Sequence, residues 1–128
     1  MHQPAGFQTV VPYLFVDGAA AFLQFLSEGL GAREMLRHAE GERIAHAQVL
    51  IGDAVMMVSD TAPDFPAMPS SFYVYTPNAD QAVAKAIAAG AVLISAVEDK
   101  PYHDRQGGVR DRWGNIWWIS QRLTAELY

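Results

Sequence analysis

The chain has 128 residues, which predicts one domain able to bury about two thirds of its unfolded surface. Hydrophobic residues make up 51% of the chain and charged residues 18%, which excludes a disordered protein. A net charge of −5 without a basic patch argues against nucleic acid as a partner, and the absence of cysteine excludes disulfides and thiolate catalysis. Because the chain has no signal pattern and no apolar run long enough for a bilayer, we expect a cytoplasmic protein without a membrane partner.

The first half of the chain reads as a strand, a helix and three further strands. The expected elements are a strand over 7–16, a helix over 18–29 and strands over 32–38, 43–51 and 54–59. Asp17 is expected to be the N-cap of the helix, and Gly29 and Gly31 are expected to end it. The segment 61–70 is rich in proline, which excludes regular structure and predicts a linker.

The second half repeats this order. The expected elements are a strand over 71–76, a helix over 79–89 that Asn78 caps, strands over 91–97, 106–110 and 116–120, and a turn over 111–115. Leu30-Gly31-Ala32 matches Ala89-Gly90-Ala91, and Asp17 matches Asn78, at a shift of about 60 residues. The chain therefore reads as the pattern βαβββ written twice.

The repeated pattern predicts an α+β fold. The helix of a βαβββ unit covers one face of its sheet, so two units would give a curved sheet with helices outside and a concave face inside. We expect two such modules, over 7–60 and 71–121, to form a paired half-open barrel within a single domain. The linker is 61–70 and a C-terminal tail follows over 122–128. The concave face is the expected place for a ligand.

Three segments carry a resemblance to a known family. VVPYLFVDGAAAFLQFLSEGLGA, RIAHAQVLIGDAVMMVSD and PYHDRQGGVRDRWGNIWWIS resemble the vicinal-oxygen-chelate superfamily, which includes glyoxalase I, bleomycin-resistance proteins and extradiol dioxygenases. They are most similar to its PhnB-like branch. His103, Arg112 and Trp113 stand where that branch usually has Gly, Pro and Phe, all at turn positions. The resemblance implies the fold and a homodimer, whereas the reaction varies across such a superfamily.

The resemblance also implies where a metal would bind. Enzymes of this family hold a divalent metal with His, Gln or Glu from the first and last strands of each module. Matching the motifs places these four positions on Val10, Met57, Ser71 and Trp118. None of them offers an imidazole or a carboxylate. We therefore expect no metal cofactor at the usual site.

Alternation along the strands sorts side chains into two faces. If Met57 and Trp118 face the cavity, Trp117 and Ile119 pack under a helix. The expected ligand-binding residues are His46, Gln48, Met57, Tyr73, Tyr75, Arg105 and Trp118.

Two of these residues have more than one interpretation. His46 is a weak candidate for a general base, and the alternative is a half-buried histidine that binds a neighbour. Arg105, beside His103 and Asp104, could clamp an anionic ligand or form an internal Asp–Arg pair that fixes a loop.

The leading hypothesis is a metal-independent protein that binds a small planar organic molecule, similar to drug-sequestering resistance proteins. The alternative is a metal-dependent glyoxalase-like lyase or isomerase, or a dioxygenase, with a non-standard metal site near His46. A third interpretation is a protein that acts only through its dimer surface. Whether a reaction is catalysed is left open by the sequence.

Overall fold

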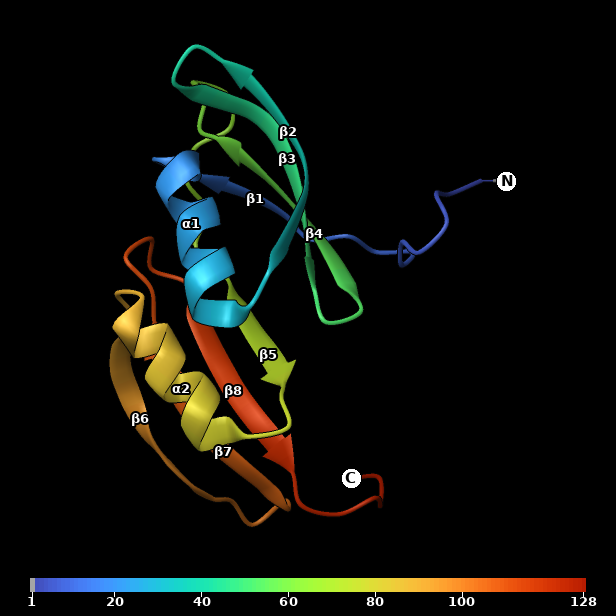
Figure 1. The fold of residues 1–128 in the computed structure, drawn as a ribbon, viewed down its shortest axis with the longest axis vertical. Coiled ribbons are helices and arrows are strands. Elements are labelled where there is room, and N and C mark those ends of the chain that lie inside the picture. The colour runs from blue at the N-terminus through green and yellow to red at the C-terminus, as the bar shows by residue number, and fades with distance from the viewer. Residues whose placement is uncertain (1) are drawn as a thin grey trace. The chain divides into compact units, whose positions relative to one another are not determined.

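The computed structural model describes residues 2–128 and contains two βαβββ modules (Figure 1). The first module consists of β1 (Tyr13–Val16), α1 (Ala19–Leu30), β2 (Arg33–Glu40), β3 (Arg43–Ile51) and β4 (Ala54–Asp60). The second consists of β5 (Ser71–Tyr75), α2 (Ala79–Ala88), β6 (Val92–Asp99), β7 (Asp104–Arg110) and β8 (Ile116–Arg122). One compact unit ends at Met68 and the other runs from Pro69 to Tyr128. The expected α+β class with two βαβββ modules is confirmed.

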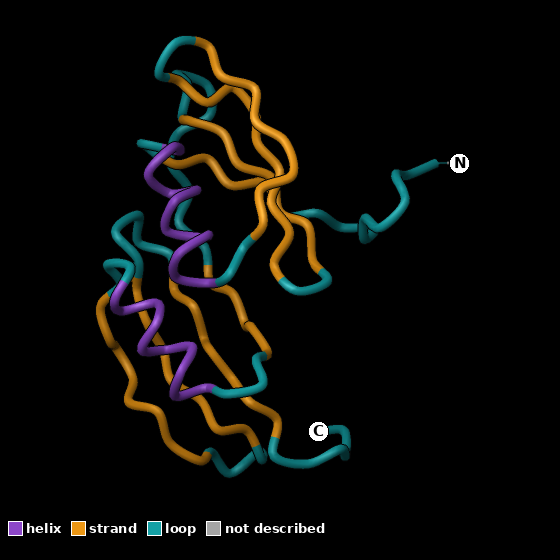
Figure 2. Tube along the Cα trace, viewed as in Figure 1, coloured by secondary structure: helices purple, strands orange, loops and turns teal. Residues whose placement is uncertain are grey.

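Each module builds a four-stranded sheet with the same strand order. The orders are β1-β4-β3-β2 and β5-β8-β7-β6, so the internal repeat extends from element order to topology. In both sheets the first and last strands of the module pair in parallel, and the other pairs are antiparallel. The tube drawing shows both sheets as open rather than closed, each with its helix along one face (Figure 2). Within each module, the helix leaves the opposite face of the sheet uncovered (Figure 2).

Most expected elements lie where they were predicted, with ends shifted by at most two residues. The first strand is the exception, because β1 begins at Tyr13 and not at residue 7. The side-chain amide of Gln8 takes the place of strand pairing there, since it both donates to and accepts from the backbone of Val55, at 2.6 and 3.2 Å. Pro12 has no N–H to donate and contributes only its carbonyl, to the amide of Met57 at 2.9 Å.

The predicted N-cap of the first helix was wrong. Gly18 occupies that position with φ of 88°, and as a glycine it has no side chain that could cap the helix. The carboxylate of Asp60, at the end of β4, accepts instead from the amides of Gly18 and Ala19 at 3.0 and 2.9 Å. Its second oxygen accepts from the amide of Ile44 at 2.8 Å. Asp60 therefore ties the end of β4 to the start of both α1 and β3.

The second helix has the expected cap and a second one that matches the first module. The side chain of Asn78 accepts from the amide of Gln81 at 3.0 Å, as predicted. The side chain of Gln121, near the end of β8, also accepts from the amide of Ala79 at 3.0 Å. Gln121 thus contributes to the cap of α2 as Asp60 does to the cap of α1.

A β-bulge corrects one predicted face. Between the pairs His38–His46 and Ala39–Ile44, Ala45 has no partner of its own on β2. The extra residue turns Ile44 toward the helix side, where it is buried with Ala47. Strict alternation along β3 would place Ala45 on the same side as Ala47, but Ala45 is only half-buried.

The alternation of the two tryptophans on β8 is confirmed. Trp117 is 1% exposed, its ring stacks on Phe72, and its indole donates to Asp111 at 2.9 Å. Asp111 also accepts from the amides of Trp113 and Asn115, both at 2.9 Å, so it forms the predicted turn. Trp118 lies on the other face of the sheet, away from α2.

Two consecutive glycines on β7 allow both faces to pack tightly. A Cβ on Gly107 would lie 2.7 Å from Val97 and 3.1 Å from Val83 of α2. A Cβ on Gly108 would lie 2.7 Å from the ring of Trp118 on the opposite face. The sequence Gly107-Gly108 therefore sets both the approach of the helix and the position of Trp118.

Within residues 2–128, neither helix is long and apolar enough to cross a membrane.

Replacement of Asp60 by Asn should lower the free energy of unfolding at neutral pH by about 1–2 kcal/mol, because a helix cap is lost. Partial burial acts to raise the pKa of Asp60, but the backbone amides of Ala19, Ile44 and Gly18 and the charge of Arg43 outweigh it and lower the pKa. The stabilisation is therefore present above the unfolded value of about 3.9 and is lost as pH falls through the lower folded pKa.

Urea denaturation followed by circular dichroism should show the difference between Asp60→Asn and the wild type shrinking in acid. The exposed Asp64 offers the matched control Asp64→Asn, which should behave as the wild type does. A difference that does not change with pH would contradict the proposed role of the carboxylate.

Gly107→Ala should lower the free energy of unfolding by about 1–3 kcal/mol, since the new methyl group overlaps a stiff β-branched side chain. Val97→Ala in the same protein should recover part of that loss, because it removes the nearest methyl group. A double-mutant cycle from urea unfolding measures the coupling. If the two effects simply add, the close approach does not determine stability.

Candidate functional site

In the first module, the predicted polar residues lie side by side on the face away from α1. Gln48 of β3 pairs with Met57 of β4, and Met57 pairs with Tyr13 of β1. His46 bridges this row, with Nδ1 3.0 Å from the Tyr13 hydroxyl and Nε2 3.1 Å from the Gln48 side-chain nitrogen. Which ring nitrogen donates and which accepts depends on the tautomer of His46. Both ring nitrogens of His46 are thus engaged with neutral partners, the arrangement expected for a structural histidine.

In the second module, three predicted ligand residues share one face. Tyr73 of β5 pairs with Trp118 of β8, and Tyr75 follows on the same side of β5, with the two tyrosine rings 5.3 Å apart. The indole of Trp118 donates to the hydroxyl of Ser71 at 3.0 Å. The face opposite α2 is therefore aromatic along β5 and β8.

Arg105 does not join this face. Alternation along β7 turns it toward the helix side, where it pairs with Asp80 of α2 at 2.7 Å and with Asp99 of β6 at 2.9 Å. The hydrogen bonds to these two carboxylates raise the pKa of Arg105 above its usual value. The expected Asp–Arg pair therefore exists, but its carboxylates are Asp80 and Asp99 and not the neighbouring Asp104.

Asp104 is the centre of the aromatic face. Its side chain is 0% exposed, although it lies on the side of the sheet that no helix covers. One carboxylate oxygen accepts from Arg122 at 2.9 Å. The other accepts from the hydroxyls of Tyr73, Tyr75 and Tyr128, the last at 2.8 Å. A buried charge of this kind is stable because it is paired with a cation and hydrogen-bonded throughout.

A second polar chain runs beside the first. The side-chain amide of Gln106 donates to the hydroxyl of Ser120 at 2.7 Å, and its oxygen accepts from the hydroxyl of Tyr102 at 2.6 Å. Gln106 and Ser120 are both buried. The hydroxyl of each tyrosine on this face is thus hydrogen-bonded, while its ring is partly exposed.

These rings wall a depression in the second module. It has a volume of about 370 Å³ and is lined by Tyr73, Tyr75, Tyr102 and Tyr128, and it is called the tyrosine hollow below. A second depression of about 460 Å³ shares Tyr75 and is lined by Thr76, Pro77, Gln121 and Arg122. The tyrosine hollow offers aromatic surface with fixed orientation.

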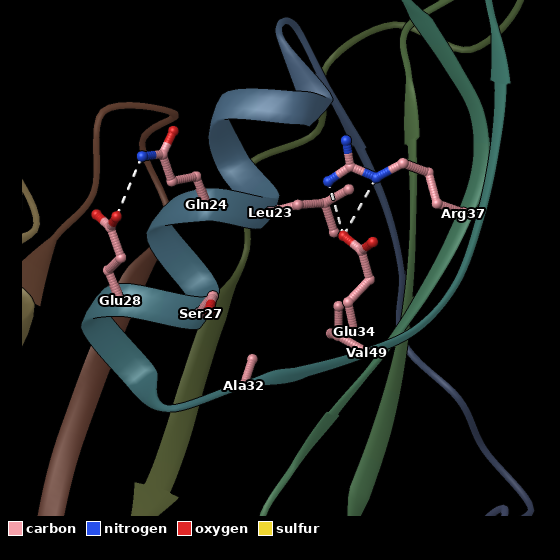
Figure 3. A pocket seen from close by; sticks show the side chains of 8 residues that line it. All are labelled: Leu23, Gln24, Ser27, Glu28, Ala32, Glu34, Arg37 and Val49. Atoms are coloured by element: carbon pink, nitrogen blue, oxygen red, sulfur yellow. Dashed lines mark hydrogen bonds and ion pairs between the residues drawn. The ribbon is translucent and has the colours of Figure 1, made fainter.

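The first module has a depression of a different character. It measures about 290 Å³ and lies between α1 and β2, with Leu23 pointing toward Glu34 and Arg37 (Figure 3). The two charged groups pair with each other at 2.7 Å. No aromatic ring lines this depression, and the one cation that lines it, Arg37, is already paired with Glu34. It is the weaker candidate for an organic ligand.

The family model that matches the chain is that of the Glyoxalase/Bleomycin resistance protein/Dioxygenase superfamily, over residues 6–119. The chain belongs to this superfamily. The match extends across both modules and confirms the resemblance found in three sequence segments. Assignment to the PhnB-like branch stays a prediction.

Several proteins are similar to this superfamily member over most of its length. The uncharacterized protein Mb0911c of Mycobacterium bovis is 27% identical over 122 residues, which cover 86% of this chain and 80% of that protein. The crystal structure of TioX from Micromonospora sp. ML1 matches with a TM-score of 0.76 and 27% identity, covering 91% and 99% of the two chains. TnmS3 from Streptomyces sp. CB03234, described as an antibiotic binding protein, matches with a TM-score of 0.71 and 18% identity over 94% and 99%. At 18% identity, this last likeness shows the fold alone.

The four positions that the sequence resemblance assigns to a metal offer no fitting set of ligands. Val10 lies before β1 and is 79% exposed, so it is not on a strand at all. Met57 and Trp118 offer no ligand for a hard divalent metal, and the hydroxyl of Ser71 already accepts from Trp118. Among residues 2–128, no group of three or more His, Cys, Asp or Glu side chains is placed to hold a metal ion.

The sequence predictions missed part of the site. Asp104 and Gln106 alternate with Arg105 and Gly107, and this alternation would have separated the two faces if the strand had been started at residue 104. Arg122 and Tyr128 carry no comparable signal, because only the folded chain brings them to Asp104.

His103, one of the departures from the branch, has a φ of 66° in the turn before β7. Glycine adopts this conformation without strain, which accounts for the residue usual there.

Tyr73→Phe should remove a late step from the alkaline titration of the protein. Burial raises the pKa of the Tyr73 hydroxyl above its ordinary value, and its hydrogen bond to Asp104 raises it further. The folded state is therefore stabilised by this group below the unfolded pKa of about 10, and the stabilisation is lost as pH rises through the folded pKa.

Tyrosinate absorbance measures this step, with circular dichroism confirming that the protein stays folded. In the wild type, one phenol should remain neutral after free tyrosine has ionised. A Tyr73→Phe protein that keeps the late step would assign it to another residue.

Proposed function

We propose that the protein binds a small, flat aromatic molecule in the tyrosine hollow and that binding needs no metal. Trp118, on the same face, adds aromatic surface beside Tyr73. The proposal concerns binding and includes no catalysed reaction.

The tyrosine hollow is the observation that carries the proposal. Its volume of about 370 Å³ is in the range of small-molecule pockets, and four aromatic rings line it. The hydroxyls of Tyr73 and Tyr75 are fixed by Asp104, and that of Tyr102 by Gln106. Because the rings are held before a ligand arrives, little side-chain entropy is lost on binding. Flat aromatic ligands gain most from such prearranged rings.

Two further considerations support a binding role. TnmS3, which shares the fold, is described as an antibiotic binding protein. The superfamily's metal positions Val10, Met57, Ser71 and Trp118 carry no carboxylate or imidazole, so we propose that the ligand is held by aromatic contacts and hydrogen bonds.

We propose a separate ligand-contact face within the first module. We propose His46, Gln48 and Met57 for it, since their side chains lie in one row on the side away from α1. Arg105 is left out of the set because it is engaged on the helix side.

We also propose a symmetric homodimer, which analytical ultracentrifugation would detect.

Trp118→Ala should weaken the binding of a planar aromatic ligand about tenfold, because a stacking surface is lost. Thermal-shift screening of polycyclic aromatic compounds would identify a ligand, since a compound that binds only the folded state raises Tm with concentration. Isothermal titration calorimetry then gives the affinities.

Trp113→Ala is the matched control, because Trp113 lies in the turn that precedes β8 and not on the aromatic face. Unchanged affinity in Trp118→Ala would contradict the proposal. Elemental analysis of the purified protein tests the metal-dependent alternative. If the wild type holds near-stoichiometric metal and His46→Ala loses it, the metalloenzyme alternative replaces the binding proposal.

A further inference from the structure

One wall of the tyrosine hollow comes from the C-terminal tail. The Tyr128 hydroxyl donates to the carboxylate of Asp104 and also contacts the hydroxyl of Tyr75. Its ring lies against the guanidinium of Arg122, with 4.2 Å between the ring centroid and Cζ. The tail thus places a phenol where an aromatic ligand would meet a cation and a carboxylate.

The tail is held by few contacts. Tyr128 is 77% exposed and Leu127 is 93% exposed, so their docking buries little apolar surface. Beyond the contacts of Tyr128, a hydrogen bond from Arg122 to the carbonyl of Glu126, at 2.8 Å, anchors the segment. A segment held this loosely can be displaced at low free-energy cost.

The carboxylate has more donors than one oxygen accommodates. The oxygen of Asp104 that faces the hollow accepts from Tyr73, Tyr75 and Tyr128, whereas a carboxylate oxygen offers about two lone pairs. Tyr73 and Tyr75 belong to β5 and are fixed by the sheet. Tyr128 is the donor that can leave without disturbing the sheet.

We propose that Tyr128 occupies, within the protein itself, the place of a ligand phenol, and that the natural ligand is a hydroxylated aromatic molecule that displaces it. The inference rests on the proposed binding function and names the class of ligand. The incoming hydroxyl donates to Asp104, and the incoming ring stacks on Arg122.

The chemistry of the site selects the neutral phenol. Asp104 is a carboxylate paired with Arg122, so the position accepts a hydrogen bond and repels a second negative charge. A methyl ether of the same ring system has no proton to donate and would leave the acceptor unpaired. The depression lined by Arg122 adjoins the tyrosine hollow, since Tyr75 lines both.

Calorimetric titration with 2-naphthol and with 2-methoxynaphthalene, at neutral pH, tests the proposal. The two probes have the same ring system and differ in the donated proton. Tyr128→Ala should tighten the binding of 2-naphthol about three- to tenfold, because the competing phenol is gone and a larger fraction of the protein is ready to bind. The affinity for 2-methoxynaphthalene should change less. Leu127→Ala is the matched control and should bind both probes as the wild type does, since its side chain is almost fully exposed.

The outcomes separate this proposal from the binding function on which it rests. Tighter binding of 2-naphthol by Tyr128→Ala alone supports displacement of the tail. If both probes bind and Tyr128→Ala changes neither affinity, the tail proposal is overturned and the aromatic binding function stands. If neither probe binds the wild type or Tyr128→Ala, both are overturned. If Tyr128→Ala tightened the binding of both probes equally, the proposal that the ligand is recognised by its donated proton would be overturned.

Discussion

The buried carboxylate of Asp104 organises the face of the second module's sheet that α2 leaves uncovered. Removing a carboxylate from water costs several kcal/mol, so the charge persists in the interior only where partners surround it. Those partners come from three places in the chain: the tyrosines of β5, Arg122 at the end of β8, and Tyr128 of the tail. Because Tyr73, Tyr75 and Arg122 converge on one charge, that charge fixes how β5 meets the end of β8, and Tyr128 adds a donor from the tail. The orientation of the aromatic rings follows from that requirement.

Local patterns were sufficient to predict most of the fold. Alternation separated Trp117 from Trp118, and Asn78 capped the second helix as its position indicated. The failures have a common cause, since both depend on contacts between residues far apart in sequence. The Gln8 side chain replaces strand pairing through Val55, and the cap of α1 comes from the end of β4. No pattern within a short window contains such partners.

Only part of the site could be predicted, because the rest again depends on contacts between residues far apart in sequence. Tyr73 and Tyr75 were placed on the ligand side because they alternate on a strand whose ends the sequence marks. Arg105 was placed there by its chemistry, which suits an anion, and the structure turns it to the helix side. Whether the residues on the ligand side bind anything stays a prediction. Their burial and hydrogen bonding depend on the pairing of β5, β8 and β7, which only the folded topology provides.

Trp118, which packs tightly on Gly108, is one of three tryptophans that are unevenly distributed along the chain. All three tryptophans, Trp113, Trp117 and Trp118, lie in the second module, and the first contains Tyr13 but no tryptophan. Intrinsic tryptophan fluorescence therefore comes from the second module alone. Loss of structure confined to the first module would leave the tryptophan emission nearly unchanged, so it would be visible by circular dichroism and silent to fluorescence. Tryptophan emission is therefore an intrinsic probe of the module that contains the tyrosine hollow.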